Sequence, residues 1–181
     1  MKWGEAELAD LHADFAAAVR PILGEAEAEG LDVRRQSGGR SNARQAGLYA
    51  TYLAEKAKFD RGERPEPPLP AAPAGKSAHN YSLCSREPGH RIGAAQACPE
   101  CGAASKLAAL ALDVALLDAN GKAIHCPPLA LALRPAEWQQ WAGILARHPL
   151  VRDGGAFKGR LDVVHFESAG WNVLDHSYRK P

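Results

Sequence analysis

The sequence predicts a single α+β domain in which a small antiparallel sheet is flanked by helices. Segments with helical periodicity alternate with short aliphatic segments, and the chain has no strand–helix–strand repeat of the kind that builds parallel sheets. Its length of 181 residues is enough for one hydrophobic core. We therefore expect one domain covering residues 1–181.

Charge and hydropathy exclude several classes of partner. The chain has 22 Lys and Arg against 21 Asp and Glu, a net charge of +1, so no binding to nucleic acid or to an acidic membrane surface is expected. The N-terminus lacks the apolar core of a signal peptide. The longest apolar run, Leu107 to Leu117, contains Asp113 and is too short to span a bilayer. We expect a monomer, made in the cytoplasm, that does not insert into membranes.

The N-terminal part predicts a helix followed by a strand. Apolar residues recur at helical spacing over residues 5–29. Pro21 is expected to kink or restart this helix, and Gly30 to cap its C-terminus. Residues 31–36 then alternate between apolar and polar as a strand does.

A second helix is predicted over residues 42–58, with Ser41 as its N-cap. Its apolar residues are expected to face the core; they are Leu48, Tyr49 and Leu53. Residues 59–76 are rich in Pro and Gly and predict a long surface loop. Loops of this length are often functional.

The next elements after the central region are a hairpin and a helix. Residues 113–126 predict a hairpin with its turn at Asn120-Gly121. Pro135 suits the start of a helix that covers residues 135–147. We expect a loop over residues 151–155.

The last core strand is predicted over residues 161–166, which are mostly aliphatic. Residues 171–181 are expected to be peripheral. The helices and the short strands together give the α+β class.

Two histidines and two acids form a pattern typical of a zinc site. If residues 84–110 are removed, the flanking segments join into one strand-like segment with His79 near its start and Asp113 near its end. A second histidine, His165, follows Asp162 by three residues. Two His and one Asp are a usual set for catalytic zinc, because three protein ligands leave the fourth position open for water. The sequence therefore predicts a catalytic zinc on His79, Asp113 and His165.

Three motifs resemble those of one family in order and approximate spacing, over residues 8 to 168. Residues 77–83 joined to 111–113 (SAHNYSL–ALD) resemble a Ser-x-His-x-x-Gly-x-Ala-x-Asp signature. Residues 162–167 resemble a motif of an acid, two residues and a His, and residues 37–45 (SGGRSNARQ) resemble a Ser-Gly-Tyr-Arg-Ser-x-x-x-Gln box. These motifs are those of the zinc D-Ala-D-Ala carboxypeptidases and of the phage endolysins that cut the L-alanyl-D-glutamate bond of peptidoglycan.

The resemblance implies a fold like that of hedgehog and D-Ala-D-Ala peptidases, carrying a Cys-rich inserted loop, and a zinc metallopeptidase that cleaves peptidoglycan stem peptides. The small size favours a phage endolysin that acts on the cell wall after release from the host cytoplasm. The chain departs from the pattern at Ser82, where the family has Gly, at Gly39, where it has an aromatic residue, and in the insertion over residues 84–110. These departures concern pocket shape and substrate and leave the ligand set intact.

The same resemblance assigns roles around the zinc. Asp162 is the expected general base, which takes a proton from water and passes it to the leaving amine. Glu167 is a rival that we rank lower. Arg40 is expected to stabilise the charge that develops on the substrate carbonyl oxygen. Gln45 is expected to support the substrate-binding pocket or Arg40, and Ser77 to hydrogen-bond the substrate.

The insertion has its own metal-binding pattern. Cys98 and Cys101 form a Cys-Pro-Glu-Cys knuckle of the kind found in zinc ribbons, and Cys84 and His90 complete a possible set of four ligands. Cys126 is an alternative fourth ligand. A structural zinc would stabilise a loop with few large apolar residues. Free thiols or a disulfide are the alternatives, whereas a thioredoxin-type redox site is not expected because no strand leads into the knuckle.

Three functions remain open on the sequence alone. They are an L-alanyl-D-glutamate endopeptidase, a D-Ala-D-Ala carboxypeptidase, and a non-enzymatic zinc-stapled domain for cell-wall binding or assembly. The endolysin-like size and the Asp-x-x-His form of the second motif favour the endopeptidase. Two zinc ions per chain are expected for an enzyme with a stapled insertion, and one for a purely structural site.

Overall fold

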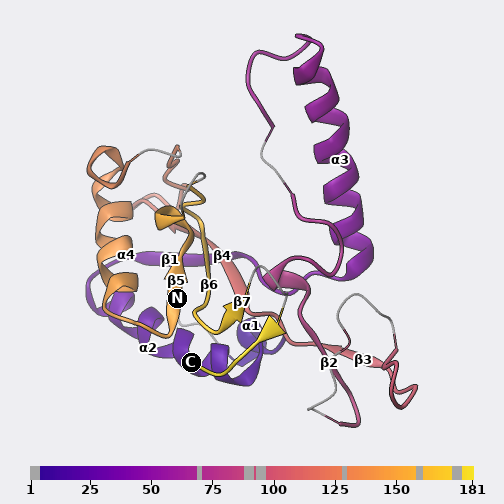
Figure 1. Cartoon of the computed structure of the whole chain (residues 1–181). Helices are drawn as coiled ribbons and strands as arrows, with labels where there is room; N and C mark the ends of the chain where they lie inside the picture. Colours follow the sequence, from indigo (N-terminus) through magenta and orange to yellow (C-terminus); the bar gives the residue numbers. More distant parts are fainter. Residues whose placement is uncertain are drawn as a thin grey trace.

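The computed structural model is built around a four-stranded antiparallel sheet with two helices against one face (Figure 1). The residues that it describes are 5–68, 71–87, 92, 97–127, 130–157, 161–172 and 177–181. Its helices and 3₁₀ turns are α1 Glu5–Leu8, α2 Ala13–Ala28, α3 Asn42–Asp60, η1 Ala78–Asn80, η2 Leu131–Leu133, α4 Ala136–Ala146 and η3 Gly154–Ala156. Its strands are β1 Asp32–Ser37, β2 Ser82–Cys84, β3 Ser105–Leu107, β4 Ala111–Leu117, β5 Val151–Asp153, β6 His165–Ser168, β7 Trp171–Asn172 and β8 Ser177–Tyr178. The predicted α+β class is confirmed.

The central sheet has the strand order β1-β4-β6-β5, and each strand is antiparallel to its neighbour. Leu112 of β4 pairs with Phe166 of β6. The ring of Phe166 lies 5.9 Å from that of Phe15 in α2 and 5.6 Å from that of Trp141 in α4, between centroids. The two helices therefore cover the face that carries Leu112 and Phe166. Because side chains alternate along a strand, the adjacent positions of β4 and β6 point to the opposite face, where a polar site can form.

The N-terminal helix is interrupted earlier in the chain than predicted. Residues 10–12 leave the helical path because their backbone pairs with Ala109: the amide of His12 donates to the Ala109 carbonyl at 2.8 Å, and the Ala109 amide donates to Asp10 at 2.8 Å. The predicted restart at Pro21 was wrong, since α2 continues across that residue. Gly30 follows the helix end with φ of 84°, which confirms its role as a cap.

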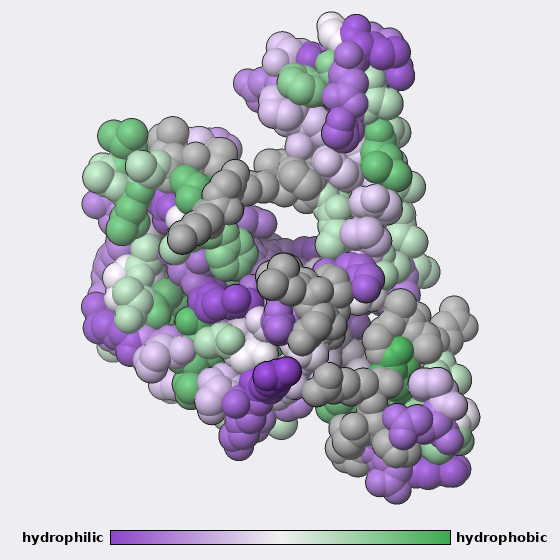
Figure 2. All heavy atoms as spheres, in the orientation of Figure 1, coloured by the Kyte–Doolittle hydropathy of each residue, from purple (hydrophilic) through white to green (hydrophobic). Residues whose placement is uncertain are grey.

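Helix α3 stands away from the rest of the molecule (Figures 1 and 2). Ser41 caps it as predicted, its hydroxyl accepting from the Arg44 amide at 3.2 Å. Of the residues of α3, all of which the structure describes, Gln45 alone is buried. The expectation that Leu48, Tyr49 and Leu53 face the core was wrong: the two leucines are 41% and 46% exposed, and Tyr49 is half-buried. Neither α3 nor any other described helix is both long and apolar enough to cross a bilayer.

A second projection leaves the body between η1 and β4. We call it the cysteine lobe, and its described residues are 82–87, 92 and 97–107. Strands β2 and β3 pair antiparallel at its base. Residues 108–110 of the predicted insertion are buried in the main core instead. A Cβ atom placed on Gly39 would overlap Leu107 of the lobe. The lobe therefore occupies the space that a larger side chain at position 39 would need.

The predicted hairpin after β4 is shorter than expected. Gly121 has φ of 75° and closes the turn, as the Asn-Gly pair predicted. The returning chain makes only one β-bridge, from Ala123 to Leu117, among the described residues. Helix α4 follows Pro135 directly, which confirms the predicted helix start.

The C-terminal part required three corrections. Residues 151–155 form β5 and part of η3 instead of a loop, because a three-residue edge strand is too short to show periodicity. The strand predicted over 161–166 begins at His165; the residues before it form a turn closed by the His165 amide and the Asp162 carbonyl at 3.0 Å. The tail is not wholly peripheral, since Trp171 is 3% exposed and belongs to the main core.

Candidate metal centre in a groove

Asp113 lies in the middle of a row of side chains that crosses the sheet. It pairs with His165 of β6 on one side and with Ser37 of β1 on the other. The β1 register shifts between Arg35 and Ser37, so one extra residue brings Ser37 opposite Asp113. Directly opposed residues in antiparallel strands present their side chains on the same face. The bulge thus brings the start of the motif of residues 37–45 beside Asp113 and His165, which belong to the other two motifs.

His79 reaches this row from outside the sheet. It lies on the 3₁₀ turn η1 and not on the predicted strand-like segment. Ser77 caps the turn, its hydroxyl accepting from the His79 amide at 3.3 Å. The Ala78 carbonyl accepts from the Leu110 amide at 2.9 Å. This bond holds η1 beside the start of β4 although the cysteine lobe separates them in sequence.

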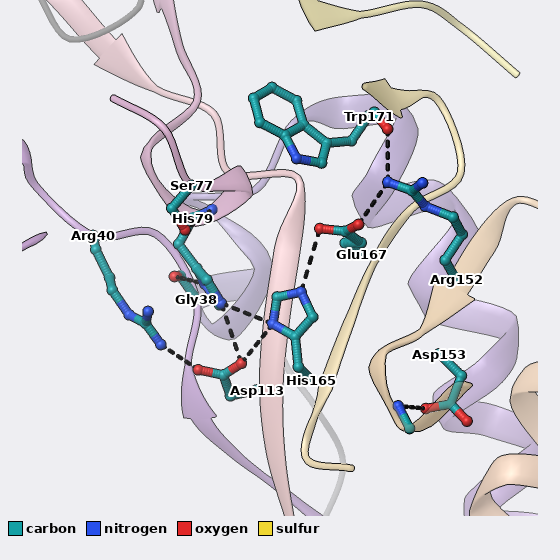
Figure 3. A network of polar contacts seen from close by, with 11 residues as sticks. Gly38, Arg40, Ser77, His79, Asp113, Arg152, Asp153, His165, Glu167 and Trp171 are labelled. Carbon is teal, nitrogen blue, oxygen red and sulfur yellow. Dashed lines mark hydrogen bonds and ion pairs between the residues drawn. The ribbon is translucent and has the colours of Figure 1, made fainter. Parts of the chain in front are cut away.

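The three predicted zinc ligands meet in space (Figure 3). Asp113 Oδ1 lies 3.1 Å from His79 Nε2 and 3.0 Å from His165 Nδ1, and the two nitrogens are 3.2 Å apart. A tetrahedral zinc ion with ligands at about 2.0–2.1 Å would place them about 3.3 Å from each other. The donor types and the triangle that they form therefore fit zinc.

The second ring nitrogen of each histidine is held by a partner that fixes the ring. His79 Nδ1 donates to the Gly38 carbonyl at 2.7 Å, which leaves Nε2 with its lone pair toward the centre. His165 Nε2 lies 3.3 Å from Glu167 Oε2, which leaves Nδ1 free to bind a metal. Partners of this kind set the tautomer and orientation of metal-binding histidines.

Glu167 is itself anchored by a residue that sequence reasoning missed. Arg152 Nη2 donates to Glu167 Oε1 at 2.6 Å and to the Trp171 carbonyl at 2.7 Å. Glu167 contacts the His165 nitrogen that is turned away from Asp113 (Figure 3), a position from which it can orient the His165 ring. Arg152 was missed because it lies in β5, a segment predicted to be a loop.

Arg40 lies at the opposite edge of the centre. Its Nη2 pairs with Asp113 Oδ2, and its Nε donates to Ser37 Oγ at 2.9 Å. Its backbone is tied to η1, since the Arg40 amide donates to the His79 carbonyl at 2.8 Å and Asn80 Nδ2 donates to the Arg40 carbonyl at 2.6 Å. The role of Asn80 was not predicted; a buried amide next to a candidate ligand histidine is the signal that could have revealed it.

The charges of the centre favour a cation. Burial alone would raise the pKa of Asp113, but hydrogen bonds with His165 and His79 hold that pKa far below its usual range. Burial lowers the pKa of His79. Burial also opposes the charge on His165, yet Asp113 and Glu167 raise its pKa to about 9. Two carboxylates thus favour a proton on His165, and a bound metal ion would replace that proton.

The centre lines a groove of about 580 Å³ that α3 and the segment after it share with the sheet. Pockets that bind small molecules and short peptide segments are commonly of this size. The groove brings together all the residues predicted for catalysis, for substrate binding and for the catalytic zinc; they are Arg40, Gln45, Ser77, His79, Asp113, Asp162 and His165.

Asp162 is placed by the turn before β6. Its amide donates to the Gly154 carbonyl at 2.9 Å, and its carbonyl accepts from the His165 amide at 3.0 Å. A Cβ on Gly154 would lie 2.6 Å from the Asp162 carbonyl oxygen and 2.7 Å from that of His165. Only glycine allows this close approach of η3 to the turn.

Gln45 and Ser77 belong to the wall of the groove. Gln45 is 1% exposed, and its Nε2 donates to the Ala72 carbonyl at 2.7 Å. This bond ties α3 to the segment that follows it. Gln45 Oε1 has no partner among the described residues. Ser77 uses its hydroxyl to cap η1, so its main contact is structural.

The predicted cysteine ligands divide into two groups. The sulfurs of Cys84, Cys98 and Cys101 lie within 4.8 Å of one another in the cysteine lobe. Cys126 packs against the main core, and its thiol donates to the Pro127 carbonyl at 3.5 Å, so it is not part of this cluster. His90 lies outside the described residues.

Comparisons with known proteins give weak structural similarity and no match in sequence. No family model matches the sequence, and neither does any curated protein sequence. Among solved structures, the chain is similar to the crystal structure of Serratia marcescens L-Ala D-Glu endopeptidase ChiX, with 18% sequence identity and a TM-score of 0.46. The alignment covers 91% of this chain and 85% of that one. This similarity is too weak to transfer an activity to this chain.

Proposed function

We propose that the chain is a zinc peptidase that cleaves peptidoglycan stem peptides at the L-alanyl-D-glutamate bond. The observation that carries the proposal is the triangle of donors from His79, Asp113 and His165, spaced for a tetrahedral ion and open to a groove. Asp162 and Arg40 line the same groove. The resemblance of the three motifs to zinc peptidoglycan peptidases supports the substrate class.

The residues of the groove divide the chemistry between them. A zinc ion on the three ligands would supply Lewis acidity and make water nucleophilic near neutral pH. Asp162 takes the proton of the attacking water and passes it to the leaving amine. Arg40 has five N–H donors, and its contacts with Ser37 and Asp113 leave others to stabilise negative charge on the substrate carbonyl oxygen.

The site also orders its parts before a substrate arrives. Arg40 and His79 are joined by a backbone hydrogen bond, so the cation and one ligand keep a fixed separation. His165 is held by Glu167 and Arg152 from behind. Reacting groups that are already in place do not have to be ordered during the reaction, which lowers the barrier.

An internal peptide bond needs room for the chain on both sides of the cut, and a groove bounded by α3 and the sheet supplies more room than a closed pocket for a terminal carboxylate. On this proposal the enzyme acts on the cell wall after release from the cytoplasm.

Purified muropeptides incubated with the zinc-loaded protein should yield free L-alanyl termini and D-glutamyl peptides by mass spectrometry. Release of D-alanine instead would identify a carboxypeptidase.

Ligand variants test the catalytic metal. His79→Ala, Asp113→Ala and His165→Ala should each abolish cleavage and remove one zinc ion per chain. His125→Ala is the matched control, because His125 is exposed and is not part of the donor cluster. This variant should keep its zinc content and its activity. Full activity in any ligand variant with its zinc content intact would refute the assignment.

A further inference from the structure

The cysteine lobe contains a second cluster of donors that the proposed peptidase reaction does not use. Cys84 is the last residue of β2, and Cys98 and Cys101 lie at a turn that precedes β3 in the chain. Their sulfurs lie within 4.8 Å of one another, and the Cys84 and Cys101 sulfurs are 3.4 Å apart. Residues 17 positions apart in the chain have thus been brought to one point.

The backbone around the sulfurs is arranged to receive thiolates. The amides of Arg86 and Glu87 donate to Cys84 Sγ at 3.4 and 3.3 Å. The knuckle is closed by the Gly102 amide, which donates to the Cys98 carbonyl at 2.8 Å, and Gly102 has φ of 70°. Hydrogen bonds to a charged acceptor favour its charged form. The amides therefore stabilise the ionised sulfur that a metal ion requires.

The lobe has little else to hold it together. Among its described residues, the buried cluster consists of Cys84, Ile92 and Cys98, with Cys101 and Ala103 packed against it. Clusters of this size do not bury enough apolar surface to offset the entropy of ordering the chain. Small units of this kind are commonly stabilised by a structural metal or a disulfide.

We propose that Cys84, Cys98 and Cys101 bind a structural zinc ion that holds the cysteine lobe in place. A tetrahedral zinc ion with sulfur ligands at about 2.3 Å would place the sulfurs about 3.8 Å apart. This spacing is compatible with the structure, in which all three sulfurs lie within 4.8 Å of one another. Thiolates are soft ligands that favour zinc over Mg²⁺ or Ca²⁺. A disulfide between any two of these residues would leave the third without a role, and none of the three is bonded in a disulfide in the structure.

The lobe is coupled to the groove through its base. The Ala108 amide donates to the Tyr81 carbonyl at 2.9 Å, and the Leu110 amide donates to Ala78 at 2.9 Å. Both bonds join the segment that directly follows the lobe to η1, which carries His79, or to the residue after it. Loss of the thiolate-bound metal should therefore weaken the contacts that position His79. The proposal of a thiolate site does not itself depend on the proposed peptidase activity.

The test is metal analysis of the full chain and its variants. The wild type should contain two zinc ions per chain. Cys98→Ser and Cys101→Ser should each contain one zinc ion, and His79→Ala should also contain one. Cys126→Ser is the matched control, because that thiol lies against the main core; it should contain two. After replacement of zinc by cobalt, the thiolate-to-cobalt charge-transfer bands should persist in His79→Ala and disappear in Cys98→Ser. This pattern distinguishes a failure of the proposed thiolate site from a failure of the proposed catalytic zinc site.

A thiol titration keeps the proposal testable if Cys98→Ser does not fold. In the folded wild type, three of the four cysteines should react with a thiol reagent only after a chelator is added, and one zinc ion should be released with them. Three thiols that react equally fast without chelator would overturn the proposal. So would a Cys98→Ser protein with unchanged metal content and melting temperature, or a disulfide detected by mass spectrometry.

Discussion

Glu167 provides the sharpest test of how the centre is built, because two roles are open to it. The structure places its carboxylate on the His165 nitrogen that faces away from the other ligands, and Arg152 holds it from behind. If Glu167 orients His165, its removal should weaken metal binding. If it were the general base, its removal should slow turnover at any zinc concentration.

The expected magnitude follows from this contact. Removal of a group that orients a metal-binding histidine typically costs 10–100-fold in metal affinity, or about 1.4–2.7 kcal/mol. Glu167→Ala should reach the upper part of this range, since the His165 ring loses its partner. Glu167→Gln should lose about tenfold, because the amide oxygen still accepts the hydrogen bond while the charge is lost. Arg152 is 38% exposed and can be solvated when its partner is removed.

The assay is a chelator competition that gives the zinc dissociation constant, combined with turnover measured at saturating zinc. Both Glu167 variants should regain most of the wild-type turnover once zinc is saturating. Glu63→Ala is a matched control that removes an exposed ion pair with Arg61, beyond the end of α3; it should change neither quantity. Wild-type zinc affinity combined with a lasting loss of turnover in Glu167→Gln would refute the positioning role.

Other substitutions test the remaining parts of the groove. Asp162→Asn should keep the catalytic zinc and lose turnover by roughly 10²–10⁴-fold, as expected for a general base; loss of zinc would make Asp162 a ligand instead. Arg40→Ala should lower kcat more than it raises KM in steady-state kinetics, because its contact strengthens in the transition state, and an effect on KM alone would make it a binding residue. Gly154→Ala should lower the free energy of unfolding by about 1–3 kcal/mol, because its Cβ would approach the carbonyl oxygens of Asp162 and His165; an unchanged melting temperature would contradict this.

The chemistry of the centre was largely determined by the sequence. The identity of the donors is local information, and the spacing of His79, Asp113 and His165 within their motifs indicated a metal site before any geometry was known. Caps and turns were also predictable, since Ser41 and Gly121 act on neighbouring backbone atoms. What depends on a few adjacent residues can be inferred from those residues.

The tertiary structure decided which surfaces meet. Helical periodicity identified an apolar face on α3 but could not show that Leu48 and Leu53 would lack a partner in the core. The short strand β5 and its Arg152 gave no periodic signal, so the support behind Glu167 stayed hidden. The alignment of the ligands depends on cross-strand register, on the β1 bulge and on hydrogen bonds that hold η1 beside β4. These are contacts between segments far apart in the chain, and their geometry is set by packing that no local pattern encodes.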